Sequence, residues 1–382
     1  MIEQKKYVVL PQKKNKERNV GIDLLRLIGM LDIVIFHTII DSNIYNRYYR
    51  YSKQIKYMEV FTNWHISNFG IISGIVGHKN YKTIKYSNLL YLWLLVLFYR
   101  ITVHYCYKIY NPKFYTFDST ISYFFPVIFN AHWYFSCYFG MYFFLPLINR
   151  GIYYLKKSEF TIIVFSLIGI FILWRDFNLF RVYKDLDPFG LNSGRSMIGL
   201  IVFYIIGAYI GKYFIIENRT RKIYYYILCM IIFYVCGHLN NHYFNYSGRS
   251  IYKKILKALF GFRLNSITTL GQSISLALFF SQIKFNKNIG KYISFLGQMA
   301  FSVYLIHDHS DIRYVIFKDL FNKYSNNLSV SIVLFYVLLN AYKVFIICII
   351  IDCVRLFIFK LLRIRNFCLY LDKVIYLLID KF

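Results

Sequence analysis

Apolar runs of about twenty residues recur from one end of this chain to the other, and they constrain its fold more than any single motif. A helix of that length spans the hydrocarbon core of a bilayer. Hydrophobic residues make up 58% of the 382 residues, which favours a membrane protein over a soluble two-domain enzyme. The sequence therefore predicts an all-α fold, a polytopic membrane helical bundle with about ten transmembrane helices and no soluble domain.

The positive charge of the chain lies mainly in short segments between the apolar runs. In a soluble protein a net charge of +28 would suggest nucleic acid as a partner. Here the distribution is typical of loops that face the cytoplasm, so the predicted contacts are with membrane lipids and not with nucleic acid. Residues 1–18 are basic and lack the features of a signal peptide, which places them in the cytoplasm. With ten spans, both termini are predicted to be cytoplasmic in a multi-pass protein of the cell inner (plasma) membrane.

The predicted organisation has three parts. Residues 1–18 form a cytoplasmic basic tail, residues 19–354 form the transmembrane domain, and residues 355–382 form a basic amphipathic tail in the membrane plane. The ten predicted spans cover residues 19–41, 57–78, 88–107, 132–149, 159–174, 196–216, 223–237, 258–283, 289–307 and 330–351.

The first span carries ionisable groups that a membrane helix rarely contains. Asp23, Arg26 and His37 lie within about 60° of one another at roughly 100° per residue, so they form one polar stripe. Arg26 and His37 are separated by about 16 Å along the helix axis. Such groups mark a functional pathway inside a bundle. The alternative is a structural ion pair between Asp23 and Arg26, with a histidine at headgroup level.

The second span is interrupted by small and polar residues, among them Ser73 and Gly74. These residues allow either close approach of a neighbouring helix or close approach of the backbone to a ligand. The loop that follows carries Lys79, Lys82 and Lys85. They are placed to meet an anionic group, although setting the topology is an alternative role for each.

The seven cysteines show no paired spacing that indicates zinc or a disulfide framework. They are interpreted as apolar filling within the spans. The sequence predicts no metal site and no bound cofactor.

Three stretches, in this order, resemble the membrane acyltransferase-3 family. GIDLLRLIGMLDIVIFH is similar to the opening helix of that family, in which Asp and Arg precede a His. FGIISGIVG is similar to its second helix with Ser-Gly, and HWYFSCYFGMYFFLPLIN with SFLGQMAFSVYLIH resembles its Trp-bearing central helix and late Tyr-Leu-x-His helix. The chain departs from the family after the second helix, where KYSNLLYLWLL has Lys85 but no proline.

The resemblance implies an O-acyltransferase of the bacterial cell envelope, with residues 19–354 as its transmembrane acyltransferase domain. The implied reaction moves an acyl group, most often acetyl from acetyl-CoA, to a sugar hydroxyl of a surface polysaccharide or its lipid-linked precursor. His37 suits the role of general base or transient acyl carrier, because neutral imidazole is available near physiological pH. Arg26 can hold phosphate or a developing oxyanion, and Asp23 would orient it.

An acyl donor and a carbohydrate acceptor must both be bound, and two further sets of residues are predicted for this. Predicted contacts to the donor are Ser73, Gly74, Lys79, Lys82 and Lys85. Predicted lining residues of the reaction cavity are Trp133, Tyr304 and His307.

Two other classes of protein remain open from the sequence. A membrane glycan polymerase or ligase acts on lipid-linked saccharides, but its catalytic charges are expected in large outer loops. A polysaccharide flippase typically shows broken helices or paired repeats around a midplane site. The polar first helix favours acyl transfer over both.

Overall fold

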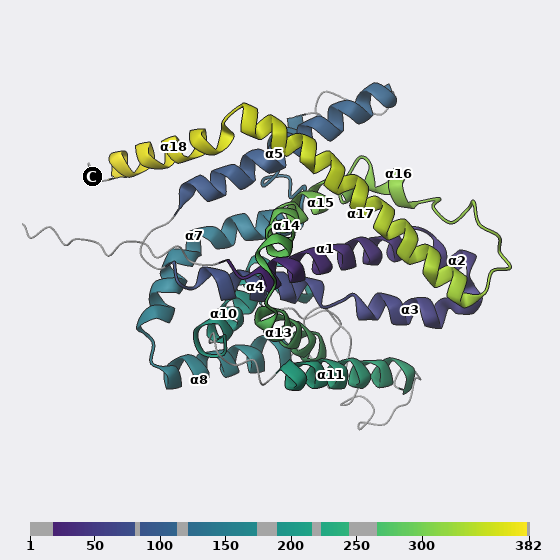
Figure 1. Cartoon of the computed structure of the whole chain (residues 1–382), viewed down its shortest axis with the longest axis horizontal. Helices are drawn as coiled ribbons and strands as arrows, with labels where there is room; N and C mark the ends of the chain where they lie inside the picture. Colours follow the sequence, from purple (N-terminus) through teal and green to yellow (C-terminus); the bar gives the residue numbers. More distant parts are fainter. Residues whose placement is uncertain are drawn as a thin grey trace, which may run out of the picture.

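The computed structural model describes residues 18–80, 85–112, 121–173, 189–215, 223–243 and 266–379. Within these ranges every regular element is a helix and none is a strand, so the predicted all-α class is confirmed there (Figure 1). The α-helices are α1 (Val20–Ile40), α2 (Ile44–Arg47), α3 (Ser52–Phe61), α4 (His65–Gly77), α5 (Tyr86–Tyr110), α7 (Trp133–Tyr154), α8 (Lys157–Ile168), α10 (Met197–Tyr213), α11 (Ile223–Tyr243), α13 (Ile267–Gln282), α14 (Lys287–Gly297), α15 (Ala300–His307), α16 (Arg313–Phe317), α17 (Val330–Leu361) and α18 (Ile364–Ile379). Short turns of other helix types are η1 (Tyr49–Tyr51), η3 (Ser122–Phe124), η4 (Gly169–Leu173) and η5 (Asn192–Gly194).

Two segments in the described ranges are long and apolar enough to cross a membrane. They are α5 and the segment Lys287–His307, which contains α14 and α15. The predicted third and ninth spans fall within them. Helix α10 is apolar but short, at 17 residues. A bundle of about ten membrane crossings stays a prediction.

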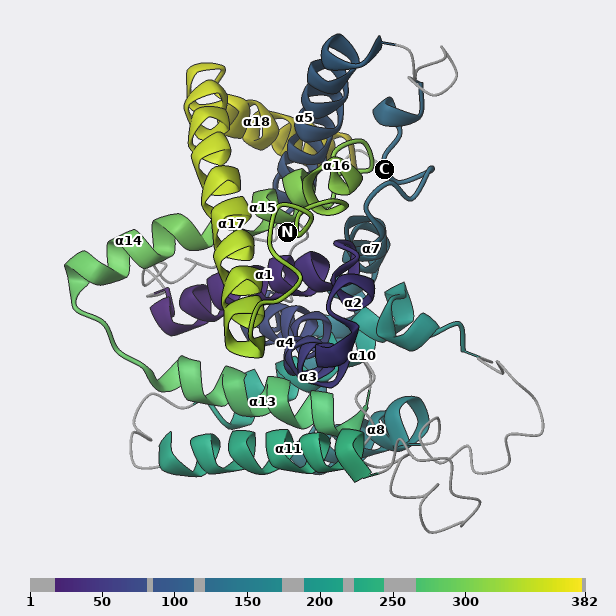
Figure 2. The same ribbon diagram turned by 90° about the vertical axis from the view of Figure 1, so that its right-hand side faces the viewer.

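Helix α1 lies in the middle of the molecule (Figures 1 and 2). It packs against α4, α13, α14, α15 and α17. Its first half contributes Ile22 and Leu25 to one hydrophobic cluster, and its second half contributes Val34 and Ile39 to another. Asn19 begins the helix by accepting a hydrogen bond from the backbone N–H of Ile22 at 3.2 Å, as N-cap residues do. The polar groups of α1 are therefore held between the two main parts of the core.

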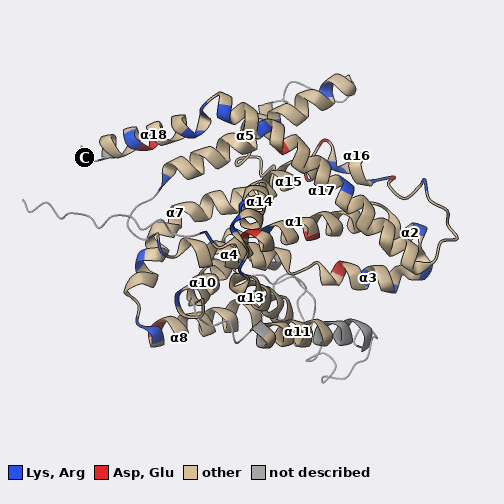
Figure 3. Cartoon of the chain, in the orientation of Figure 1, with Lys and Arg blue, Asp and Glu red and all other residues tan. Residues whose placement is uncertain are grey.

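The C-terminal part of the chain forms two helices. The predicted boundary at residue 354 falls inside α17, which continues to Leu361 before Arg363 adopts a left-handed conformation with φ of 51°. Helix α18 then runs beside α5, where Ser87 donates a hydrogen bond to Asp372 at 2.9 Å. Figure 3 shows Lys and Arg along α18 and at the junction of α7 and α8. The division into three parts stays a prediction.

Helices α4 and α10 meet through glycines. A Cβ atom added to Gly74 would lie 2.0 Å from the carbonyl oxygen of Tyr204, and one added to Gly207 would lie 2.1 Å from that of Ile71. Both distances are far below a van der Waals contact. Small residues allow this close backbone approach. In the structure Gly74 therefore serves helix packing, one of the two roles open from the sequence.

We expect Gly74→Ala to destabilise the protein by about 1–3 kcal/mol, because the new methyl group overlaps a backbone atom that cannot move away. The matched control is Gly151→Ala in α7, where an added Cβ meets no atom within 4 Å. That change should be neutral or slightly stabilising, since alanine favours helix more than glycine does. Thermal melting of both variants in detergent measures the difference. Equal melting temperatures would contradict the packing role.

Candidate active site along helix α1

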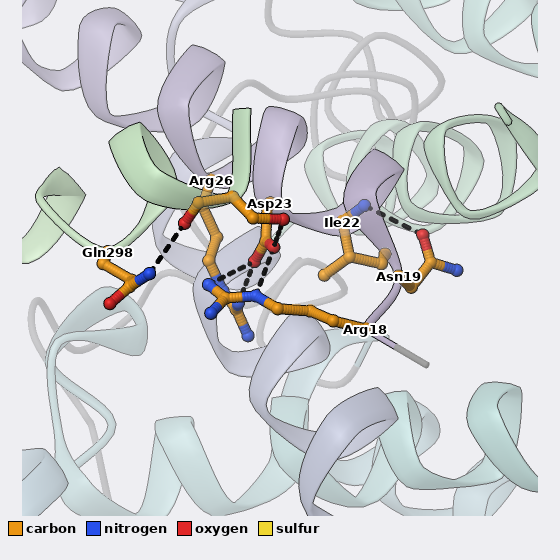
Figure 4. A network of polar contacts seen from close by, with 7 residues as sticks. Arg18, Asn19, Ile22, Asp23, Arg26 and Gln298 are labelled. Carbon is orange, nitrogen blue, oxygen red and sulfur yellow. Dashed lines mark hydrogen bonds and ion pairs between the residues drawn. The ribbon is translucent and has the colours of Figure 1, made fainter. Parts of the chain in front are cut away.

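Asp23 and Arg26 form an ion pair in the first turns of α1. Nη1 of Arg26 lies 2.7 Å from Oδ1 of Asp23, whose side chain is only 1% exposed. Arg18 also contacts this carboxylate, and Ser294 of α14 donates a hydrogen bond to it at 2.9 Å. Figure 4 shows both arginines converging on Asp23. The carboxylate thus orients Arg26, whose own side chain remains 26% exposed.

Arg26 opens onto a cavity of about 220 Å³ between α1, α4, α5, α7 and α10. Of the residues predicted for catalysis or donor binding, Arg26, Ser73 and Lys85 line this cavity. The sequence analysis did not identify its other polar residues, which carry amide or phenol groups and come from four segments. These are Asn80, Asn88, Tyr138, Tyr142, Asn149 and Tyr204.

A hydrogen-bond network holds the wall of this cavity. The hydroxyl of Tyr204 donates to Asn149 at 2.8 Å, and the Asn149 amide donates to the carbonyls of Gly77 and Asn80 at 3.3 and 3.2 Å. On the other side the hydroxyl of Tyr142 donates to the carbonyl of Lys85 at 2.8 Å. Both ends of the predicted donor-binding loop are therefore tied to the cavity wall.

Of the two remaining lysines of that loop, the structure describes only Lys79. Lys79 is exposed and does not line the cavity, and Lys82 lies outside the described residues.

The other end of α1 places His37 among groups from α15 and the loop after it. The ring centroids of His37 and His307 are 5.1 Å apart, and Phe317 of α16 packs edge-on against both rings. Nδ1 of His307 donates to the carbonyl of Val303 at 2.6 Å, because a carbonyl can only accept. This hydrogen bond leaves Nε2 of His307 as an acceptor. Two imidazoles therefore lie together at the C-terminal end of the predicted stripe.

Arg313 binds two carboxylates next to these histidines. Its guanidinium contacts Asp41 through Nε at 2.8 Å and Nη2 at 3.0 Å, and it contacts Asp308 through Nη1 at 2.6 Å. Asp308 lies 3.6 Å from Nδ1 of His37. Burial raises the pKa of Asp308 to about 6, although Arg313 acts in the opposite direction. The sequence predicted no role for Asp308 or Arg313, because only the fold brings them to His37.

The predicted lining residues come from two helices, α15 and α7. Tyr304 lies on α15 with its ring centroid 6.4 Å from that of His307. Trp133 begins α7 and packs edge-on against Tyr134 at 5.7 Å, and Tyr134 in turn packs against Tyr304. None of Trp133, Tyr304 and His307 lines the cavity at Arg26. The assignments of the site residues stay predictions.

A separate polar cluster lies between α5, η3 and the loop after α15. Nδ1 of His104 lies 3.1 Å from Asp311, which also accepts from Tyr123. Arg100 donates to Ser310 at 3.0 Å and covers the ring of Tyr123 at 4.2 Å. The sequence analysis did not identify this cluster.

The two ends of α1 offer different chemistry. The cavity end provides a guanidinium, a lysine and neutral amides, which suit an anionic and hydrogen-bonding ligand. The His37 end provides imidazoles beside a carboxylate, which suit proton transfer. About 16 Å of helix separates them.

Comparison with known proteins identifies the family. A family model described as an acyltransferase domain matches residues 19–352. Neither the search of curated proteins nor the search of solved structures found a match. The matched range includes the whole of α1, the cavity at Arg26 and the His37 cluster. The chain therefore belongs to the acyltransferase-3 family and is a membrane-associated acyltransferase.

Proposed function

We propose that this acyltransferase takes an acetyl group from acetyl-CoA and transfers it to a sugar hydroxyl of a cell-surface polysaccharide or its lipid-linked precursor. The acyltransferase domain favours this reaction over glycan polymerisation and over lipid-linked saccharide flipping. The single observation that supports the donor is the cavity at Arg26, where Asp23 holds the guanidinium and hydrogen bonds to backbone carbonyls hold an amide and a phenol side chain.

The donor end of the proposed site is this cavity. Arg26 stays positively charged at any physiological pH, and its planar fork can bind a phosphate or another anion with two hydrogen bonds. The amides of Asn80 and Asn88 offer hydrogen-bonding groups that match the amide groups in the pantetheine arm of CoA. The volume of about 220 Å³ suits part of CoA and not the whole molecule. The rest would lie along the exposed loop that carries Lys79 and Lys85.

Acyl transfer itself takes place at His37 in this proposal. In the proposed step the sugar hydroxyl loses its proton to Nε2 of His37 while its oxygen attacks the thioester carbonyl carbon. The C–S bond then breaks, the acyl group stays on the sugar, and the thiolate of CoA takes up the proton. In an acyl-carrier alternative, Nε2 of His37 itself attacks the thioester carbonyl carbon and the thiolate of CoA leaves; the sugar hydroxyl then attacks the acyl group on Nε2, its proton passes to the thiolate, and Nε2 is released. Both routes require the thioester end of the donor to reach the far end of α1.

The direct test is whether purified protein in detergent consumes acetyl-CoA and releases free CoA when a glycan acceptor is added. Polymerases and flippases would not release CoA. Absence of CoA release with a range of surface glycans would overturn the proposed function.

We expect Lys85→Gln to weaken binding of acetyl-CoA about fivefold, because an exposed lysine next to an anion contributes at most about 1 kcal/mol. The affinity of the unchanged protein should fall as salt is added, and that of the variant should fall less steeply. Lys291→Gln on α14 is the matched control, since this lysine is also exposed but does not line the cavity. Isothermal titration calorimetry measures the affinity of all three proteins for acetyl-CoA. Equal affinities would remove Lys85 from the donor site.

We expect His37→Ala to lower acetyl transfer per folded molecule by about 10²- to 10⁴-fold, because it removes the base that accepts the hydroxyl proton. His104→Ala is the control, because His104 is also buried beside an aspartate but lies in the separate cluster. Both changes should lower the melting temperature, and only the first should lower turnover. Near-normal turnover of well-folded His37→Ala protein would eliminate His37 from the mechanism.

The proposed topology places both termini on the cytoplasmic side of the inner membrane. Epitope tags at residues 1 and 382 should resist added protease in sealed cells. A tag inserted after Asn327, in the loop between α16 and α17, should be cleaved because the His37 end faces outward in this topology. Cleavage of either terminal tag in sealed cells would contradict the proposed topology with two cytoplasmic termini.

A further inference from the structure

We propose that Asp308 is a positioning residue that holds the ring of His37 through Nδ1, so that Nε2 faces the acceptor hydroxyl. This inference rests on the proposed function of His37 and assigns a role to a residue outside the family motifs quoted above. In this inference His37 of α1 and Asp308 at the end of α15 form a His–Asp pair.

The geometry places Asp308 on the correct side of the ring. Oδ1 of Asp308 lies 3.6 Å from Nδ1 of His37, and in the described part of the chain Nδ1 has no hydrogen-bond partner. The two side chains are only 8% and 11% exposed, so bulk water does not compete for the contact. In the absence of substrate, hydrogen bonds between catalytic groups often have long donor–acceptor distances. A closure of less than 1 Å would bring these two atoms within hydrogen-bonding distance.

Asp308 is itself held in place from the end of α1. Arg313 donates to Asp308 with one nitrogen and to Asp41 with the other two. The backbone N–H of Asp41 donates to the carbonyl of His37 at 3.0 Å, so Asp41 caps the same helical turn that carries the imidazole. The four side chains thus form a closed ring with the helix end.

The other groups that face His37 do not provide a competing anion. They are His65 on α4, Arg195 before α10, His307 on α15 and Arg313 on α16. All of these are basic, and His307 presents an acceptor because its Nδ1–H is bound to Val303. Asp308 is therefore the carboxylate nearest to His37 in the described residues. A positive charge that forms on the imidazole during proton transfer would be stabilised by this carboxylate, the one that lies within 4 Å of the ring in the described residues.

Asp311 provides a comparison for a purely structural role of Asp308. It lies three residues further along the same loop, is also buried, and also contacts a histidine, His104 at 3.1 Å. If Asp308 only stabilises the loop, the Asp308→Asn and Asp311→Asn variants should behave alike. If Asp308 positions His37, they should differ in turnover.

We expect Asp308→Asn to lower kcat about 100-fold at an unchanged KM for acetyl-CoA, because the donor cavity lies at the other end of α1. Asp308→Glu should recover part of the rate, because the longer side chain can span the 3.6 Å gap. Asp311→Asn should lower the melting temperature and leave kcat per folded molecule unchanged. A normal kcat in folded Asp308→Asn protein would overturn the inference.

A second variant covers the case in which Asp308→Asn does not accumulate. Arg313→Lys keeps the positive charge but cannot bind both carboxylates as the guanidinium does, so Asp308 is less well held. We expect kcat to fall about tenfold, again at unchanged KM for acetyl-CoA. An unchanged kcat in this variant would also overturn the inference.

A readout without acyl transfer separates this inference from the proposed function. Diethyl pyrocarbonate modifies unprotonated imidazole, and peptide mass spectrometry reports the modified fraction of His37 at each pH. A carboxylate within 4 Å favours the protonated ring, so Asp308→Asn should move the midpoint of modification down by about one pH unit. An unchanged midpoint would contradict the pairing. A shifted midpoint in a protein that releases no CoA would overturn the proposed function and retain the His37–Asp308 pair.

Discussion

Most buried charges along and around α1 are paired with an opposite charge, and these pairs tie the helix to its surroundings; Asp32, whose Oδ2 has no partner in the described residues, is the exception. An unpaired charge in the interior of a helical bundle is strongly destabilising, whereas a paired one is tolerated. Asp23 is paired with Arg26 and Arg18, and Arg313 is shared by Asp41 and Asp308. Asp352 and Arg355 of α17, 2.7 Å apart and almost fully buried, follow the same rule and bind Tyr99 and Tyr91 of α5. Each pair fixes the position of one helix relative to another.

The site has two ends on α1. The helix carries a guanidinium near its start and an imidazole near its end. The first faces a cavity with amides and phenols, and the second faces a histidine and a carboxylate. This arrangement suits a long donor that binds through its charged part at one end and reacts at the other. It also means that substitutions at each end should affect different kinetic constants.

Close packing of α4 on α10 gives the donor cavity its shape. The glycine contacts bring Tyr204 against α4, where its hydroxyl can reach Asn149 and, through it, the carbonyls of Gly77 and Asn80. Helix packing and ligand binding are thus divided between neighbouring residues. Gly74 contacts α10, while Ser73 lines the cavity.

The sequence by itself determined the all-α class, the approximate positions of the helices and the unusual polarity of the first one, because these follow from local composition and helical period. It also predicted a catalytic role for Arg26 and donor contacts for Ser73 and Lys85; the structure places all three around one cavity, and the roles themselves stay predictions. It did not predict the pairing of Asp308 with His37, the double contact of Arg313, or the role of Asn149. These groups are far apart along the chain, and no local pattern specifies which of them meet. Only the packing of α15 and α10 around α1 and α4 decided those contacts.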